Sequence, residues 1–223
     1  MVVSVPVRIL FGLAMAATAV TVLSVTFAAL SYRGRTGERF SMLNHFISEL
    51  GEIGVSRRAW AFNAGLVLTG LLLLPFAVYL GILLRGILGW IGAAFAVAAS
   101  LGAAAVGVFP MNTLKRHIPA AMAFFYGGLG MALCIGAAIL AQPAGRVVIP
   151  RAASLLSLVA ALAFGAFLVL PPIVLPDFDP VNQLNPLARA DRPRFWLLPF
   201  VEWQVFIWTL AWLFGMAIFV RWG

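Results

Sequence analysis

Six long stretches without a single Asp, Glu, Lys or Arg constrain this chain more than any other feature. They cover residues 9–32, 59–84, 86–114, 118–145, 152–176 and 203–220. Each is long enough to cross a hydrocarbon core, which takes about 20 residues of helix. A backbone inside a bilayer must satisfy its own hydrogen bonds, and these stretches lack the period-two alternation of a barrel strand. The predicted fold class is therefore all-α, an integral membrane bundle of six transmembrane helices.

We expect one membrane domain over residues 1–223, because no Ser/Gly-rich linker or repeat separates the stretches. The predicted helices cover about 7–31, 60–84, 87–109, 118–141, 152–175 and 200–221. The first stretch is longer than the hydrophobic part of a signal peptide, so we interpret it as a retained helix.

The turns near Arg85 and at 142–150 are short and the loops at 31–58 and 177–201 are long, and the turn at 109–117 is expected on the side of the long loops. Both termini and the short turns near Arg85 and at 142–150 should share one side of the membrane, and the long loops the other. Five of the 15 basic residues fall on the terminal side, whereas all seven acidic residues fall on the loop side. Counting only Lys and Arg, the positive-inside rule places the loop side in the cytoplasm. Clustered Arg beside Glu in the first loop can instead serve binding or pairing, so charge alone leaves the orientation open.

The first long loop contains the segment HFISELGEIG at residues 45–54. Apolar Leu43, Phe46, Ile47 and Leu50 follow helical spacing, and His45, Ser48, Glu49 and Glu52 follow it on the opposite side. This pattern predicts a short amphipathic helix over about 40–53, lying at the membrane interface.

Two interpretations of the polar stripe remain open. It can be the water-facing side of an interfacial helix. Alternatively, His45 and Glu49, one helical turn apart, face a shared site as an acid/base pair or as metal ligands. A metal would need further ligands, and His117 is the next candidate.

Two other segments bring polar groups to the same side. Pro110 ends one helix and Pro119 suits the first turn of the next, so His117 lies at a helix entrance, as a cap, ligand or proton carrier. Glu202 begins the last apolar stretch, where a carboxylate should face the bundle or the headgroup layer. It can also simply complement the positive end of the helix.

These segments resemble two membrane families. ISELG at 47–51 followed by AFNAGL at 61–66 is similar to a first signature of the prokaryotic family called domain of unknown function 998 (DUF998). GVFP at 107–110 with HIPAA at 117–121 resembles its second signature. The six-helix arrangement is also distantly similar to the eukaryotic DRAM, Sfk and Frag proteins. The matching positions are Ser48, Glu49, Gly51, His117 and, more loosely, Glu202.

The first family carries no assigned activity. The Frag-type relatives include a factor in lipid remodelling of GPI anchors, and their motif-bearing loops face the lumen. The resemblance therefore implies cytoplasmic termini and an outward-facing site in a bacterial or archaeal cell membrane. The eukaryotic motif has Asp where this chain has Glu49, so no substrate can be transferred.

Three function classes follow. The first is an enzyme acting on a lipid or its headgroup, with His45 or His117 as base or metal ligand, Glu49 and Glu202 as carboxylate partners, and Ser48 as nucleophile or positioning hydroxyl. Exposed cations would bind an anionic headgroup in that case, namely Arg57, Arg58, Lys115 and Arg116. The second class is a small transporter or lipid-binding protein without covalent chemistry. The third is a structural or assembly subunit of a membrane complex.

The net charge of +8 is interpreted as attraction to anionic lipids rather than to nucleic acid. The chain has no Walker loop, dinucleotide fingerprint or paired Cys-x-x-Cys motif, so no nucleotide cofactor is expected. Haem is not expected either, because both histidines are predicted near helix ends on one side. Membrane lipids are the expected partners, and the sequence does not determine the oligomeric state.

Overall fold

Six long helices make up most of the part of the chain that the structure, a computed structural model, describes, residues 5–174 and 192–222. They are α1 (Val5–Ser31), α2 (Ala59–Leu84), α3 (Gly86–Val108), α4 (Leu114–Leu140), α5 (Ser154–Val174) and α7 (Leu197–Trp222). All six are long and apolar enough to cross a membrane. The prediction of an all-α integral membrane protein with six spanning helices is confirmed.

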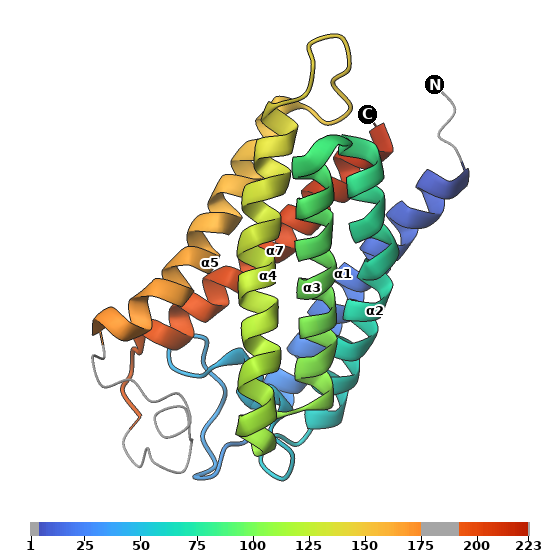
Figure 1. Cartoon of the computed structure of the whole chain (residues 1–223). Helices are drawn as coiled ribbons and strands as arrows, with labels where there is room; N and C mark the ends of the chain where they lie inside the picture. Colours follow the sequence, from blue (N-terminus) through green and yellow to red (C-terminus); the bar gives the residue numbers. More distant parts are fainter. Residues whose placement is uncertain (1–4, 175–191, 223) are drawn as a thin grey trace.

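The helices run roughly lengthwise between two dissimilar ends (Figure 1). The start of α1, the end of α7, the α2–α3 turn and the α4–α5 connection lie at one end, which we call the terminal end. The opposite end, the loop end, carries the connections at 32–58 and 109–113 and the residues that lead into α7. The loop end is therefore where the three polar segments of the sequence meet.

The six helices form a closed ring. Each of them contacts the next in chain order, and α7 also contacts α1. Small residues let α3 and α4 approach closely: a Cβ at Gly102 would collide with the backbone of Phe124, and one at Gly127 with the backbone of Ala99. Such close backbone contacts are a common basis of helix packing in membranes.

The connection between α3 and α4 is a tight helical hairpin. Pro110 lies in extended conformation after α3, and Met111–Thr113 form one turn of 3-10 helix before α4 begins. The prediction of Pro119 in the first turn is wrong, because α4 begins at Leu114; Pro119 lies in its second turn, where it cannot donate the usual hydrogen bond to the carbonyl of Lys115. His117 is thus held at the entrance of α4 and is buried.

The prediction of an amphipathic α-helix over 40–53 is wrong. Only Ile47–Gly51 are helical, as a 3-10 helix, and turns surround them. Contacts on both faces hold the segment: the N–H of Trp196 donates to the carbonyl of Leu43, and the Asn63 side chain donates to the carbonyl of Gly51. Gly54, at a positive φ of 86°, helps to end the segment. Both the apolar and the polar residues of this segment contact the protein, so their helical spacing does not mark a helix with one face in water.

Candidate functional site

The three ionisable side chains of the segment at residues 45–54 are buried at the loop end. His45 and Glu49 are each 2% exposed, and Glu52 is 3% exposed. Leu50 packs between Tyr32, Phe62 and Trp203 in the same region. These residues are therefore not the water-facing side of an interfacial helix. Because their side chains are buried, any charge on them requires a partner inside the protein.

Glu49 forms a bidentate ion pair with Arg192. The two guanidinium nitrogens of Arg192 lie 3.0 and 2.9 Å from the two carboxylate oxygens, and the N–H of Phe46 donates to Glu49 at 2.8 Å. Arg192 also donates to the carbonyl of Asn44 at 2.7 Å. Burial raises the pKa of the Glu49 carboxyl, and the hydrogen bonds from Arg192 oppose that shift. This pair fastens the first loop to the residues just before α7.

His45 lies in an aromatic cage beside that pair. Its ring packs edge-on against Tyr32, and its Nδ1 lies 2.8 Å from Oδ1 of Asn44. Among the residues that the structure describes, the Nε2 atom has no hydrogen-bond partner, and it lies 4.0 Å from the Glu38 carboxylate. Burial, together with the charge of Arg192, lowers the pKa of His45 to about 4. The imidazole is therefore neutral at physiological pH.

Glu52 and Asn63 complete the support of this loop. Arg35 forms an ion pair with Glu52, and the amide of Asn63 donates to the carbonyl of Gly51 at 3.0 Å. The Arg35–Glu52 ion pair and the Asn63 hydrogen bond therefore both stabilise the first loop at the loop end.

Glu202, near the start of α7, joins that helix to the first loop. One of its carboxylate oxygens accepts the N–H of Ile47 at 2.7 Å, and the indole N–H of the neighbouring Trp203 donates to the carbonyl of His45 at 3.1 Å. The 3-10 segment is thereby fixed directly over the end of α7.

His117 has one ring nitrogen engaged. Its Nδ1 lies 2.8 Å from the carbonyl oxygen of Phe109, the last residue before Pro110. A carbonyl can only accept, so Nδ1 carries the proton, and in the neutral ring Nε2 is left with a free lone pair. The α3–α4 hairpin therefore sets the tautomer in which His117 can accept a proton at Nε2.

Ser48, His117 and Glu202 line two adjoining cavities. The first, which we call the middle cavity, has a volume of about 80 Å³ and is bounded on its inner side by Leu66, Phe124 and Phe206. The second, the outer cavity, has a volume of about 280 Å³ and extends between α4 and α5 along Met122 and Phe167. Three groups from separate parts of the sequence thus share one site.

The other predicted site residues lie elsewhere. His45 and Glu49 line neither the middle nor the outer cavity. The four predicted headgroup-binding cations are exposed at the loop end, two of them over aromatic rings, Arg58 over Phe27 at 5.3 Å and Arg116 over Phe109 at 5.8 Å; the other two are Arg57 and Lys115.

The metal candidates His45, Glu49 and His117 do not form a cluster. Within residues 5–174 and 192–222, no group of three or more His, Cys, Asp or Glu side chains is placed to hold a metal ion. Each of these residues instead makes hydrogen bonds or an ion pair with other side chains or with the backbone.

The sequence did not single out Arg192 or Asn63. Arg192 is one of several arginines between the fifth and sixth apolar stretches, and nothing local marks it as the partner of a residue 143 positions earlier. Asn63 carried a weak signal, as a polar residue inside an apolar stretch.

The fold and its buried polar end define an integral membrane protein with six spanning helices. Residues 15–218 match the family described as "Protein of unknown function (DUF998)". This match covers most of the chain, so the protein belongs to that family. No curated protein and no solved structure matches the chain.

Proposed function

We propose that this protein binds the polar end of a membrane lipid at Ser48, His117 and Glu202 and catalyses a reaction there in which His117 accepts a proton. The observation that carries the proposal is the shared lining of the middle and outer cavities by these three side chains. A few convergent polar groups in a largely apolar cavity are typical of a ligand site.

Each group has a role that its contacts support. Nε2 of His117 is the general base, because Nδ1 is committed to the carbonyl of Phe109. Ser48 offers a hydroxyl that makes no hydrogen bond within the described part of the chain, and it serves as a nucleophile or positions the lipid. Glu202 is held by the N–H of Ile47 and accepts hydrogen bonds from a headgroup. Glu49 and Arg192 are positioning residues, since their ion pair holds the loop that presents Ser48.

The exposed cations at the same end support an anionic lipid as the ligand. Arg57, Arg58, Lys115 and Arg116 would raise the local concentration of anionic headgroups near the site. We place the protein in a bacterial or archaeal cell membrane, with cytoplasmic termini and the site facing outward. The resemblance to the Frag-type proteins, whose relatives handle lipids, supports this assignment.

A second candidate is lipid binding or transport without covalent chemistry. It is favoured by one observation: Ser48 and His117 both lie in the described part of the chain, and no hydrogen bond joins them. Catalytic hydrogen bonds often tighten only when substrate binds, so this observation favours the second candidate without excluding the first.

The two histidines provide a matched test. Purified protein in liposomes of phosphatidylglycerol and phosphatidylethanolamine is assayed for lipid turnover by mass spectrometry. His117→Gln should lower turnover by roughly a hundredfold or more, the usual loss for a general base. His45→Gln, outside the cavities, should retain it. Equal turnover in both variants contradicts the proposal. A wild type that retains lipid without converting it, and a His117→Gln variant that releases it, favours the second candidate.

A further inference from the structure

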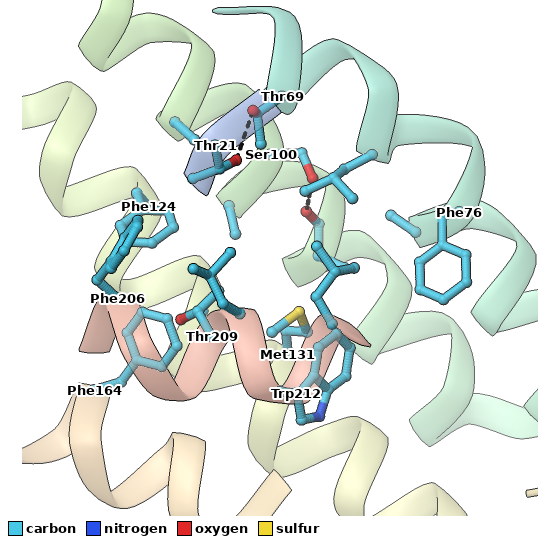
Figure 2. A pocket seen from close by; sticks show the side chains of 18 of the residues that line it. Thr21, Thr69, Phe76, Ser100, Phe124, Met131, Phe164, Phe206, Thr209 and Trp212 are labelled. Carbon is cyan, nitrogen blue, oxygen red and sulfur yellow. Dashed lines mark hydrogen bonds between the residues drawn. The ribbon is translucent and has the colours of Figure 1, made fainter. Parts of the chain in front are cut away.

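A third cavity lies in the middle of the bundle (Figure 2). This central cavity has a volume of about 110 Å³, and all six helices contribute to its wall. Figure 2 shows Thr21 and Thr69 near one another on one side, and Phe164, Met131 and Trp212 around the other. An apolar cavity of about 150 Å³ in a well-packed protein suffices for a small hydrocarbon ligand. At about 110 Å³ the central cavity is smaller than this, so it has room for the end of a hydrocarbon chain whose next part lies in the middle cavity.

The wall of the central cavity is almost entirely hydrocarbon. Its hydroxyl groups are mostly used within the wall: Thr21 and Thr69 are hydrogen-bonded to each other at 2.7 Å, and Ser100 donates to the carbonyl of Ala96 at 2.8 Å. Only Thr209 has a buried hydroxyl oxygen without a partner among the described lining residues. Water in such a cavity would find too few polar partners to be stable, whereas a hydrocarbon chain needs none.

The central cavity adjoins the site through shared residues. Leu66, Ala103, Phe124 and Phe206 line both the central and the middle cavity. The middle cavity in turn shares Ser48, His117 and Glu202 with the outer cavity. The polar groups therefore stand between an apolar interior and an outer compartment.

The outer cavity reaches the lipid-facing surface of the bundle. Tyr126, which lines it on α4, is 60% exposed, and Pro172 on α5 is exposed as well. A lipid can approach this gap between α4 and α5 without leaving the bilayer.

The depth of the interior matches a lipid tail. Seven residues separate His117 from Phe124, the first residue of α4 that lines the central cavity, which corresponds to roughly 10 Å along the helix; Met131, at the far side, lies roughly 21 Å from His117. One leaflet of the hydrocarbon core is about 15 Å deep, half of a core of about 30 Å. An extended chain anchored at His117 therefore reaches the central cavity.

Resting on the proposed function, we infer that one hydrocarbon chain of a membrane lipid enters the bundle and occupies the middle and central cavities. The linkage that joins this chain to the rest of the lipid then lies at Ser48, His117 and Glu202. A second chain, where the lipid has one, stays in the outer cavity or the bilayer. The substrate class is consequently a lipid with a hydrocarbon chain, recognised at the junction of chain and head rather than by the head alone.

Photo-crosslinking tests this inference. The probes are a long-chain fatty acid with a diazirine at its terminal carbon and a phosphatidylglycerol that carries the same chain. After irradiation in liposomes, the labelled residues are mapped by mass spectrometry. Met131 and Trp212 are 6% and 3% exposed, so label on them comes from inside the bundle. We expect both residues to be labelled in the wild type by at least one probe, and the probe that labels them more strongly identifies the free amphiphile or the phospholipid as the ligand.

Two alanines of α3 provide the matched variants. Ala103→Phe narrows the passage between the middle and central cavities, and Ala98→Phe places the same ring on the exposed side of the helix. Exclusion of two or three methylene groups from the interior weakens binding by roughly tenfold or more. Labelling of Met131 and Trp212 should fall by that factor in Ala103→Phe and stay unchanged in Ala98→Phe.

The outcomes separate this inference from the proposed function. Wild-type labelling confined to lipid-facing residues overturns the inference, even if lipid turnover depends on His117. Interior labelling that is unchanged in a folded Ala103→Phe variant also overturns it. Interior labelling in a protein without lipid turnover supports the inference and contradicts the enzymatic proposal. Should Ala103→Phe fail to fold, the wild-type map alone decides.

Discussion

The two ends of the bundle provide hydrogen-bond partners for buried backbone groups with different side chains. At the terminal end, one neutral side chain closes the α4–α5 connection. Gln142 donates to the carbonyls of Ile139 and Ile149 and accepts the N–H groups of Val148 and Ile149. At the loop end, comparable backbone groups are held by buried carboxylates, as Glu49 holds Phe46 and Glu202 holds Ile47.

This difference separates polar groups that only complete backbone hydrogen bonds from those that also line a cavity. A neutral amide can satisfy a buried turn without the desolvation cost of a charge. The loop end carries that cost at several positions and, in addition, lets Ser48, His117 and Glu202 line cavities. This contrast supports the proposed lipid site at the loop end, whereas the contacts of Gln142 at the terminal end serve the fold.

Removal of Arg192 should have the largest effect on stability. Arg192→Ala leaves Glu49 buried without its ion-pair partner, which should lower the free energy of unfolding by about 3–5 kcal/mol. Arg194→Ala, at a neighbouring exposed arginine, should change it by less than about 0.5 kcal/mol. Denaturant unfolding in detergent measures both. Equal effects would mean that the loop end does not depend on the buried pair.

Acid should weaken the loop end through His45. Its pKa is about 4 in the folded protein and about 6.5 when unfolded, so the unfolded state binds more protons between these values. Stability should therefore fall as the pH drops from about 6.5 to about 4, by up to about 1.4 kcal/mol per pH unit. His45→Gln should flatten this slope in a thermal unfolding series. An unchanged slope in that variant would show that other groups cause it.

Loss of Gln142 should be intermediate and confined to stability. Gln142→Ala leaves two backbone N–H groups and two carbonyls without their partner, and we expect a loss of about 2 kcal/mol. Lipid turnover or retention should persist in the folded fraction. If this variant loses function without unfolding, the contrast between the two ends is wrong.

The smallest effect should be a gain, at the α2–α3 turn. Arg85 has φ 53° and ψ −178°, a conformation that suits glycine. Arg85→Gly should therefore raise stability by roughly 1 kcal/mol, while Gly86→Ala next to it, at φ 67°, should lower it. The two changes are compared by melting temperature. Destabilisation by Arg85→Gly would indicate that its side chain contributes to the terminal end.

The sequence predicted the helices well because uncharged stretches of this length have few other stable forms in a membrane. Its five candidate site residues included Ser48, His117 and Glu202, but it did not separate them from His45 and Glu49, which line neither the middle nor the outer cavity. The same reasoning failed for residues 40–53, because helical periodicity cannot distinguish a surface helix from a segment buried on both faces. The Glu49–Arg192 pair joins residues 143 positions apart, and the central cavity is a space among apolar side chains that leaves no pattern in the sequence.

Native mass spectrometry of the detergent-purified protein tests the central claim most directly, by counting the lipids that remain bound. Ser48→Leu fills the site at the loop end, and Ser154→Leu makes the same change where α5 begins at the terminal end. We predict one lipid retained by the wild type and by Ser154→Leu, and its loss from Ser48→Leu. Equal retention in all three proteins, or no retained lipid in any of them, would contradict a lipid site at the loop end.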